Sequence, residues 1–529
     1  MYDLLKSRWF LIVVLIFFIM FKIPHLLYPF YWDESTPYVP AIKEMYRNGI
    51  SLMPGAINVD LSRGHPMFFH AIAAMWMHMF GPSNFSLHCF ALSISILFLI
   101  TIYETGYRLY NGRVAAIALF LTATHVSFFI QSSFVLFEIL VAFLCFLSIV
   151  LYAREKYVLC TLVLTGLFLT KESGLMAGFI IGIDALICLF RKNLSIKTKG
   201  LKLMPTAVAC LAIGLFFVLQ KQKTGFYVLP LYSETIHTKW LDIWYVFHAC
   251  CLPTVFLQDY EHAIFIALLC MATAVVFKQR SKKNASLLLA FIPATLGYLF
   301  LESRVAIFNP EYASQFAFCG FIIFYIGALL TYSAPSYYQG NRQAAQLNIL
   351  LGLFTLSFIL FSSVAYFIPR YLLAAIVPML FLLSVFLDMA IRHSYSFLWY
   401  PLLLVIGASS FFAIRENTSW GDDGMAFTDA IKTQTATVEY LERSKYHKKH
   451  ITAPFLCQRH LKDKNTGFLT GSDTFIHVVN ELEPTTELVV LDNIEADEYK
   501  RNIILNDTTY QLAYKISYNE VWSEIYKRK

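Results

Sequence analysis

The stretch WFLIVVLIFFIMFKIPHLLYPFYWDESTP, from Trp9 to Pro37, decides the class of this protein. Its apolar part, Trp9 to Leu27, follows two basic residues and is long enough to cross a bilayer once. No small-residue cleavage site follows it, so we interpret it as a retained transmembrane helix and not as a signal peptide. The acidic pair Asp33 and Glu34 comes just after this helix. We therefore expect both carboxylates close to the membrane surface.

The composition of the whole chain supports a membrane protein. Of its 529 residues, 57% are hydrophobic and only 15% are charged, whereas soluble domains carry roughly 25% charged residues. The net charge of +7 comes from short basic clusters between apolar runs, which is typical of cytoplasmic loops and not of nucleic-acid binding. Nine of the ten cysteines lie in or beside apolar segments, so we predict no disulfide framework and no structural zinc.

Keeping the basic clusters inside predicts about thirteen transmembrane helices with the N-terminus inside. The chain is then an all-α polytopic protein of the inner (plasma) membrane, with residues 1–414 as the transmembrane domain and its site facing the periplasm. Residues 28–83 form the first outer loop. The polar tail, 415–529, is expected outside as a small α+β domain, with strands at 485–492 and 510–518 and a helix near 438–446.

The first outer loop contains two segments with helical spacing of apolar residues. One runs from Pro37 to Asn48, with Ser35 or Thr36 as the expected N-cap. The other starts at His65 and ends near Phe80. We predict that the first lies along the membrane interface. The second is predicted to lie on the surface or to be re-entrant, because a crossing would place every later basic cluster outside.

Several short motifs lie in the first outer loop or at the predicted outer ends of transmembrane helices. They are Trp32-Asp33-Glu34, Ala41 with Met45 and Gly49, His65-Pro66 with Phe80-Gly81, Leu169-Thr170-Lys171, and Pro369-Arg370-Tyr371-Leu372. Together they resemble the GT-C superfamily of glycosyltransferases, in particular protein O-mannosyltransferases and bacterial lipid A aminoarabinose transferases, which are similar to glycosyltransferase family 39. The resemblance covers residues 1–190 and part of 365–385, whereas the middle helices and the tail match only in layout.

This resemblance implies an inverting glycosyltransferase of the membrane's outer face. The donor would be a sugar on a polyprenyl phosphate, held beside the membrane lipid, and the acceptor a hydroxyl of a protein, of lipid A or of a glycan. The extra lumenal module of eukaryotic protein mannosyltransferases is not seen in the sequence, which favours a bacterial envelope enzyme.

Transfer to a hydroxyl needs a general base, and we assign that role to Asp33. Glu34 is an acceptor orienter, a fold anchor or an alternative base. The phosphate is already a good leaving group, so the site needs positive charge and not a second acid. Arg370 is favoured because its planar fork matches phosphate oxygens, with Lys171 also a candidate; Tyr371 belongs to the same motif.

Other polar residues receive less specific assignments. Glu138 is predicted to hold a metal, the acceptor or Lys171. No cofactor is certain, but a divalent metal between Asp33 and Glu138 is left open. Arg63 and His65 are candidates for contact with the donor, although ordinary interface residues would look the same. The loop residues Glu302 and Arg304 are candidates for recognition of the donor sugar.

Two other functional classes share this overall pattern. A transporter or a lipid-linked glycan flippase also has many helices, but its ionisable residues should follow a central path between them. A scaffold subunit with a degenerate site would retain the motifs without activity. Because the informative charges gather on the predicted outer loops, the sequence favours a transferase.

Overall fold

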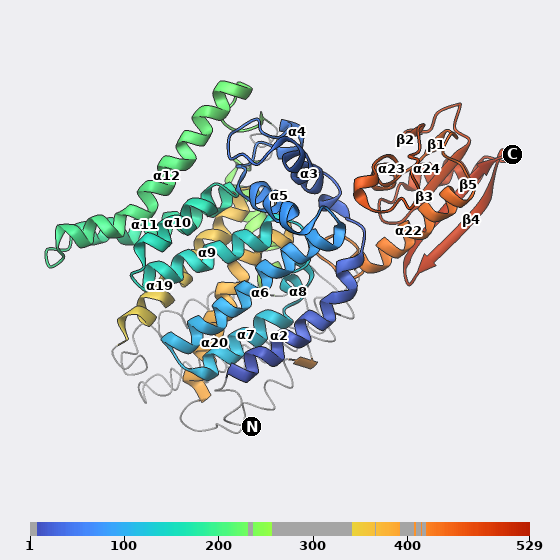
Figure 1. Cartoon of the computed structure of the whole chain (residues 1–529). Coiled ribbons are helices and arrows are strands. Elements are labelled where there is room, and N and C mark those ends of the chain that lie inside the picture. Colours follow the sequence, from blue (N-terminus) through green and yellow to red (C-terminus); the bar gives the residue numbers. More distant parts are fainter. Residues whose placement is uncertain are drawn as a thin grey trace.

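The computed structural model describes residues 8–230, 236–256, 341–365, 367–391, 407–408, 414 and 419–529. These form a helical part and a small C-terminal domain that contains a β-sheet, lying side by side (Figure 1). The sequence predicts a helical part and a small C-terminal domain of this kind, and the boundary after residue 414 stays a prediction. Several of the predicted later helices, and the loop with Glu302 and Arg304, lie outside the described residues.

Long apolar helices make up the first part. Within the described ranges, six helical stretches are long and apolar enough to cross a membrane: Arg8–Leu27, Asn84–Leu109, Glu172–Leu189, Ile196–Thr224, Arg342–Val364 and Pro369–Asp388. Their main helices are α2 (Arg8–Lys22), α6 (Asn84–Leu109), α11 (Leu175–Leu189), α12 (Ile196–Thr224), α19 (Arg342–Val364) and α20 (Leu373–Ile391). Shorter helices complete the bundle: α7 (Gly112–Thr124), α8 (Val126–Gln131), α9 (Phe137–Ala153), α10 (Tyr157–Phe168), α14 (Trp240–Tyr245), η4 (Val246–Cys251) and α15 (Leu252–Phe256). The count of thirteen spans stays a prediction.

The first outer loop folds into α3 (Tyr38–Asn48), α4 (Val59–Ser62) and α5 (Phe68–Phe80). The helices predicted from Pro37 and from His65 are thus α3 and α5. Each ends at a glycine with positive φ, Gly49 at 103° and Gly81 at 89°, a conformation that glycine adopts without the cost of a Cβ.

The predicted N-cap of the first of these helices is wrong. Pro37 occupies the cap position of α3, and no side chain caps the helix. The Ser35 hydroxyl instead donates to the Trp32 carbonyl (2.7 Å), and Thr36 Oγ1 accepts a hydrogen bond from Arg459 (2.7 Å). A local contact of Ser35 and a contact of Thr36 with the C-terminal domain thus replace the predicted capping.

The C-terminal domain has the α+β character that the sequence predicts. Its elements are α22 (Phe427–Arg443), β1 (Ile451–Thr452), α23 (Phe455–Lys462), β2 (Val478–Val479), β3 (Leu488–Asp492), α24 (Glu498–Asn506), β4 (Tyr510–Tyr518) and β5 (Val521–Arg528). The strand order is β2-β1-β3-β5-β4. β1 is parallel to β2 and β3, whereas β5 is antiparallel to β3 and β4.

The domain is fixed to the first outer loop by both polar and apolar contacts. The Phe30 amide donates to the Thr466 carbonyl (2.8 Å), and Lys43 Nζ donates to the Asn465 carbonyl (2.9 Å). The Phe427 ring, at the start of α22, packs edge-on against Phe134 with 4.9 Å between centroids. One apolar core runs through both parts, so the domain is held in one orientation against the helical part.

The packing of α6 against α7 depends on a glycine. A Cβ on Gly106 would lie 2.7 Å from Ala115 Cα, a backbone atom that cannot move aside. We predict that Gly106→Ala lowers the free energy of unfolding by about 1 to 3 kcal/mol, as overpacking does elsewhere, with a lower melting temperature of the purified protein in detergent.

Gly214 of α12 is the matched control, because a Cβ there meets no atom within 4 Å. Gly214→Ala should leave the melting temperature unchanged or raise it slightly, since alanine is the better helix former by about 1 kcal/mol. Equal effects of the two substitutions would contradict the proposed helix contact.

Candidate active site

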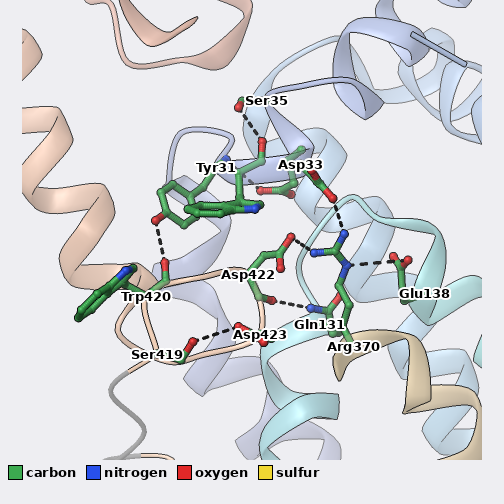
Figure 2. A network of polar contacts seen from close by, with 12 residues as sticks. Tyr31, Asp33, Ser35, Gln131, Glu138, Arg370, Ser419, Trp420, Asp422 and Asp423 are labelled. Atoms are coloured by element: carbon green, nitrogen blue, oxygen red, sulfur yellow. Dashed lines mark hydrogen bonds and ion pairs between the residues drawn. The ribbon is translucent and has the colours of Figure 1, made fainter. Parts of the chain in front are cut away.

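The buried guanidinium of Arg370 is the centre of the candidate site. Arg370 lies in η6 (Pro369–Leu372), just before α20, and is only 2% exposed. Nη2 donates to Asp33 and Nη1 donates to Asp422, while Nε lies 3.9 Å from Glu138 Oε1 (Figure 2). Carboxylates from the first outer loop, from α9 and from the connection to the C-terminal domain thus converge on one cation.

A second cation, Lys171, lies next to this cluster. Its Nζ donates to Glu138 Oε1 (2.9 Å) and lies 3.9 Å from the centre of the Tyr371 ring. Glu138 therefore bridges Lys171 and Arg370. The structure brings together five of the residues that the sequence singled out: Asp33, Glu138, Lys171, Arg370 and Tyr371.

Glu34 points away from this cluster, as expected for the neighbour of Asp33 in the chain. It accepts hydrogen bonds from the backbone amides of Val135 (2.6 Å) and Tyr31 (3.2 Å), and it lies 3.3 Å from His88 Nε2. It is only 1% exposed. Of the three roles predicted from the sequence, this geometry supports the fold anchor.

His65 and Arg63 lie before α5. His65 Nδ1 is 2.8 Å from Glu172 Oε2, so this histidine connects the first outer loop to the turn that carries Lys171. Arg63 follows α4 in a left-handed conformation (φ 49°) and is half-buried. The structure places His65 near the cluster but gives Arg63 no contact with it.

A cavity of about 340 Å³ opens beside the cluster. Its polar wall consists of His65, Glu138, Lys171, Glu172, Ser173 and Tyr371, and its remaining lining includes Val228, Ile236, Phe358, Phe361, Val364 and Ala374. Most of the apolar lining comes from α19 and from the residues that follow α12. A ligand with a charged head and a hydrocarbon tail matches this division.

Asp422 is the residue that the sequence interpretation missed. It is 3% exposed, its carbonyl accepts a hydrogen bond from Gln131 (2.6 Å), and the neighbouring Trp420 carbonyl accepts one from Tyr31 (2.7 Å) (Figure 2). Burial raises the pKa of Asp422 to about 7, against the lowering effect of Arg370.

The signal that could have revealed Asp422 is the sequence Ser419-Trp-Gly-Asp-Asp-Gly424 at the start of the polar tail. Its last glycine closes the turn, because a Cβ on Gly424 would lie 2.0 Å from the Ser419 carbonyl oxygen. Acidic residues in a turn of this kind are usually solvated, and only the tertiary fold brings this one to Arg370.

The sequence leaves open whether a divalent metal binds between Asp33 and Glu138. Both side chains lie against the Arg370 guanidinium, which already supplies positive charge at that point. In the part of the chain that the structure describes, no group of three or more His, Cys, Asp or Glu side chains has an arrangement that could hold a metal ion.

Comparison with known proteins shows the fold. No protein-family model matches the chain, and no curated protein sequence matches it. Among solved structures, ArnT from Cupriavidus metallidurans bound to undecaprenyl phosphate aligns over 98% of this chain and 97% of its own, with a TM-score of 0.52 and 13% sequence identity. The chain therefore shares its fold with this ArnT.

Two further solved structures have lower structural similarity to this chain. Apo ArnT aligns over 76% of this chain and 65% of its own, slightly under two thirds, with a TM-score of 0.45 and 14% identity. The archaeal oligosaccharyltransferase AglB from Archaeoglobus fulgidus, in complex with an inhibitory peptide and a dolichol-phosphate, aligns over 97% of this chain and 73% of its own, with a TM-score of 0.43 and 12% identity.

The anchor role of Glu34 can be tested by stability. Glu34→Ala would leave the Val135 and Tyr31 amides without their acceptor, at about 1 to 3 kcal/mol for each buried group. We expect a clear drop in the melting temperature. Glu44→Ala is the control, because Glu44 accepts a hydrogen bond from the Asn58 amide (3.0 Å) at an exposed position; an equal drop in both variants would contradict the assignment.

Proposed function

We propose that this protein is a membrane glycosyltransferase that moves a sugar from a polyprenyl-phosphate carrier to an acceptor hydroxyl on the outer face of the membrane, with inversion at the anomeric carbon. The observation that carries the proposal is the convergence of Asp33, Arg370 and Lys171, from three remote segments, beside a cavity with a polar wall and apolar lining. The GT-C fold is consistent with it, and the ArnT of similar fold was solved with undecaprenyl phosphate bound.

The cavity suits the carrier lipid. The apolar side chains from α19 match a hydrocarbon chain, whereas the ammonium group of Lys171 lies at the polar wall, where the phosphate of the carrier would bind. An ammonium group that already lies close to an aromatic ring and a carboxylate is held in place before the ligand arrives. In the proposed complex, Lys171 is therefore the first cation that the phosphate meets.

Arg370 supplies the second positive charge, but its terminal nitrogens are occupied by Asp33 and Asp422. A phosphate that approaches these terminal nitrogens competes with the two carboxylates and can displace one of them. Because an ion-paired carboxylate is a weaker base than a free one, displacement of Asp33 from Arg370 also activates it. Arrival of the donor thereby prepares the base.

Asp33 is the group that an acceptor can reach. Its side chain is 20% exposed, compared with 2% for both Arg370 and Glu34. In the proposed step, Asp33 takes the proton of the acceptor hydroxyl as its oxygen attacks the anomeric carbon. The bond from that carbon to the phosphate oxygen breaks, and Lys171 and Arg370 stabilise the negative charge of the released carrier phosphate.

Asp33→Asn tests the proposal directly. The full-length protein in lipid nanodiscs is given defined polyprenyl-phosphate sugars together with hydroxyl acceptors of the three classes: peptide, lipid A and glycan. We expect the variant to lose about 10²- to 10⁴-fold in transfer rate, the usual contribution of a general base. It should still bind the donor.

Asp60→Asn is the matched control, because Asp60 is an exposed carboxylate of the same outer loop. It should transfer at the wild-type rate. A wild-type rate for Asp33→Asn would overturn the proposal. So would movement of the intact donor lipid across the bilayer by the wild-type protein without any glycosyl product, which is the behaviour of a flippase.

The raised pKa of Asp422 predicts a pH dependence of carrier binding. Below about pH 7 its carboxyl group is mostly protonated and holds Arg370 less strongly, so a phosphate competes better for the guanidinium. The affinity for polyprenyl phosphate should therefore rise as the pH falls through about 7. Binding is measured in nanodiscs between about pH 6 and 8.

Asp422→Asn should bind polyprenyl phosphate more tightly than wild type at pH 8 and should lose most of this pH dependence. What remains in the variant reports the titration of the phosphate itself, whose second pKa is about 6. Weaker binding by the variant at pH 8 would show that Asp422 supports the phosphate site and does not compete with it.

A further inference from the structure

A second cavity, of about 560 Å³, lies in the C-terminal domain, where the proposed reaction does not use it. It opens at the carboxyl ends of the neighbouring parallel strands β1 and β3 and is bounded on the other side by the start of α24; these elements are labelled in Figure 1. In open α/β sheets this is the edge where ligands bind. Its size lies within the range of small-molecule sites, about 300 to 1,000 Å³.

Asp492, the last residue of β3, is 4% exposed and lines this cavity. Its Oδ1 accepts hydrogen bonds from the amides of Ile494 (3.1 Å) and Glu495 (3.0 Å). Its Oδ2 has no hydrogen-bond partner among the described residues. Burial raises the pKa of the carboxyl group to about 6, and no basic side chain lowers it. The hydrogen bonds of the turn thus use one oxygen of this buried carboxylate and leave the other available to a ligand.

Arg501 of α24 lines the same cavity. Its guanidinium carbon lies 4.8 Å from the centre of the Trp522 ring, so a cation–π contact holds the group in place. Its Nε is buried without a hydrogen-bond partner in the described part of the chain. The cavity is therefore lined by an acceptor and by a donor group that do not pair with each other.

The charges of the lining limit the kind of ligand. Four acidic residues, Asp492, Glu495, Asp497 and Glu498, face two basic ones, Lys500 and Arg501. Such a surface disfavours an anion such as a phosphate. A sugar hydroxyl can both donate to the Asp492 carboxylate and accept from the Arg501 guanidinium, and several hydroxyls on one ring can use several polar groups at once.

We infer that this cavity binds a neutral saccharide between Asp492 and Arg501. The inference goes beyond the proposed transfer reaction and does not depend on it, because the cavity shares no lining residue with the one beside Lys171. A saccharide bound here would be held by the same domain that supplies Asp422 to the candidate active site. The domain is then a recognition module as well as a structural one.

The test is direct binding of short neutral homo-oligosaccharides of glucose, mannose and galactose to the full-length protein in nanodiscs, with no donor present. We expect saturable binding of at least one of these to the wild type. Asp492→Asn keeps an oxygen for the turn but loses the charge, and it should bind at least about tenfold more weakly, as loss of a charge-assisted hydrogen bond implies. Arg501→Met, a second variant at a half-buried position, should weaken binding similarly.

Two controls make the outcome decisive. Asp473→Asn alters an exposed carboxylate of the same domain that does not line the cavity, and Asp33→Asn alters the candidate active site; both should bind the saccharide as the wild type does. Melting temperatures show whether each variant is folded. Absence of binding of all three sugar types to the wild type would overturn the inference. Binding that depends on Asp33, or that survives in both cavity variants, would do the same.

Discussion

One buried cation, Arg370, holds the functional part of this protein together. A guanidinium with 2% exposure is costly to remove from water, and the cost is offset only when carboxylates surround it with good geometry. Here they come from residues 33, 138 and 422. Because these positions are far apart in the sequence, the need to neutralise Arg370 fixes the first outer loop, α9 and the connection to the C-terminal domain at one place.

In the proposed reaction, the same charges prepare the site for an anion. Three carboxylates surround two cations, Arg370 and Lys171, so the cluster is close to neutral and becomes neutral when Asp422 takes up a proton. A phosphate then replaces a carboxylate in contacts that already exist, and the protein has little to reorganise. The geometry also gives two adjacent acidic residues different partners: Asp33 faces the cation, whereas Glu34 accepts hydrogen bonds from backbone amides.

Much of the helical part could be predicted from the sequence, because span length, basic loops and glycine stops are local signals. The outer-loop helices near residues 38–48 and 68–80 and the strands near 488–492 and 510–518 are where the patterns place them. From the sequence, Asp33, Lys171 and Arg370 are predicted to lie on the same side of the membrane, although the sequence contains no information on the distances between them.

The two-residue strands β1 and β2 are too short to show a periodicity, and β5 carries charged residues. The turn sequence around Asp422 does not show that this residue reaches Arg370, because its position depends on hydrogen bonds from Gln131 to Asp422 and from Tyr31 to Trp420, which are remote in the sequence.

The hydrogen bond between Tyr31 and the Trp420 carbonyl joins residues that are 389 positions apart. In a chain made from its N-terminus, the helix before Tyr31 enters the membrane long before Trp420 exists. If the proposed orientation holds, Asp422 reaches Arg370 only after the last part of the chain has been translocated. The cluster is thus incomplete until that stage of synthesis, and in a partly inserted chain Arg370 lacks one of its carboxylate partners.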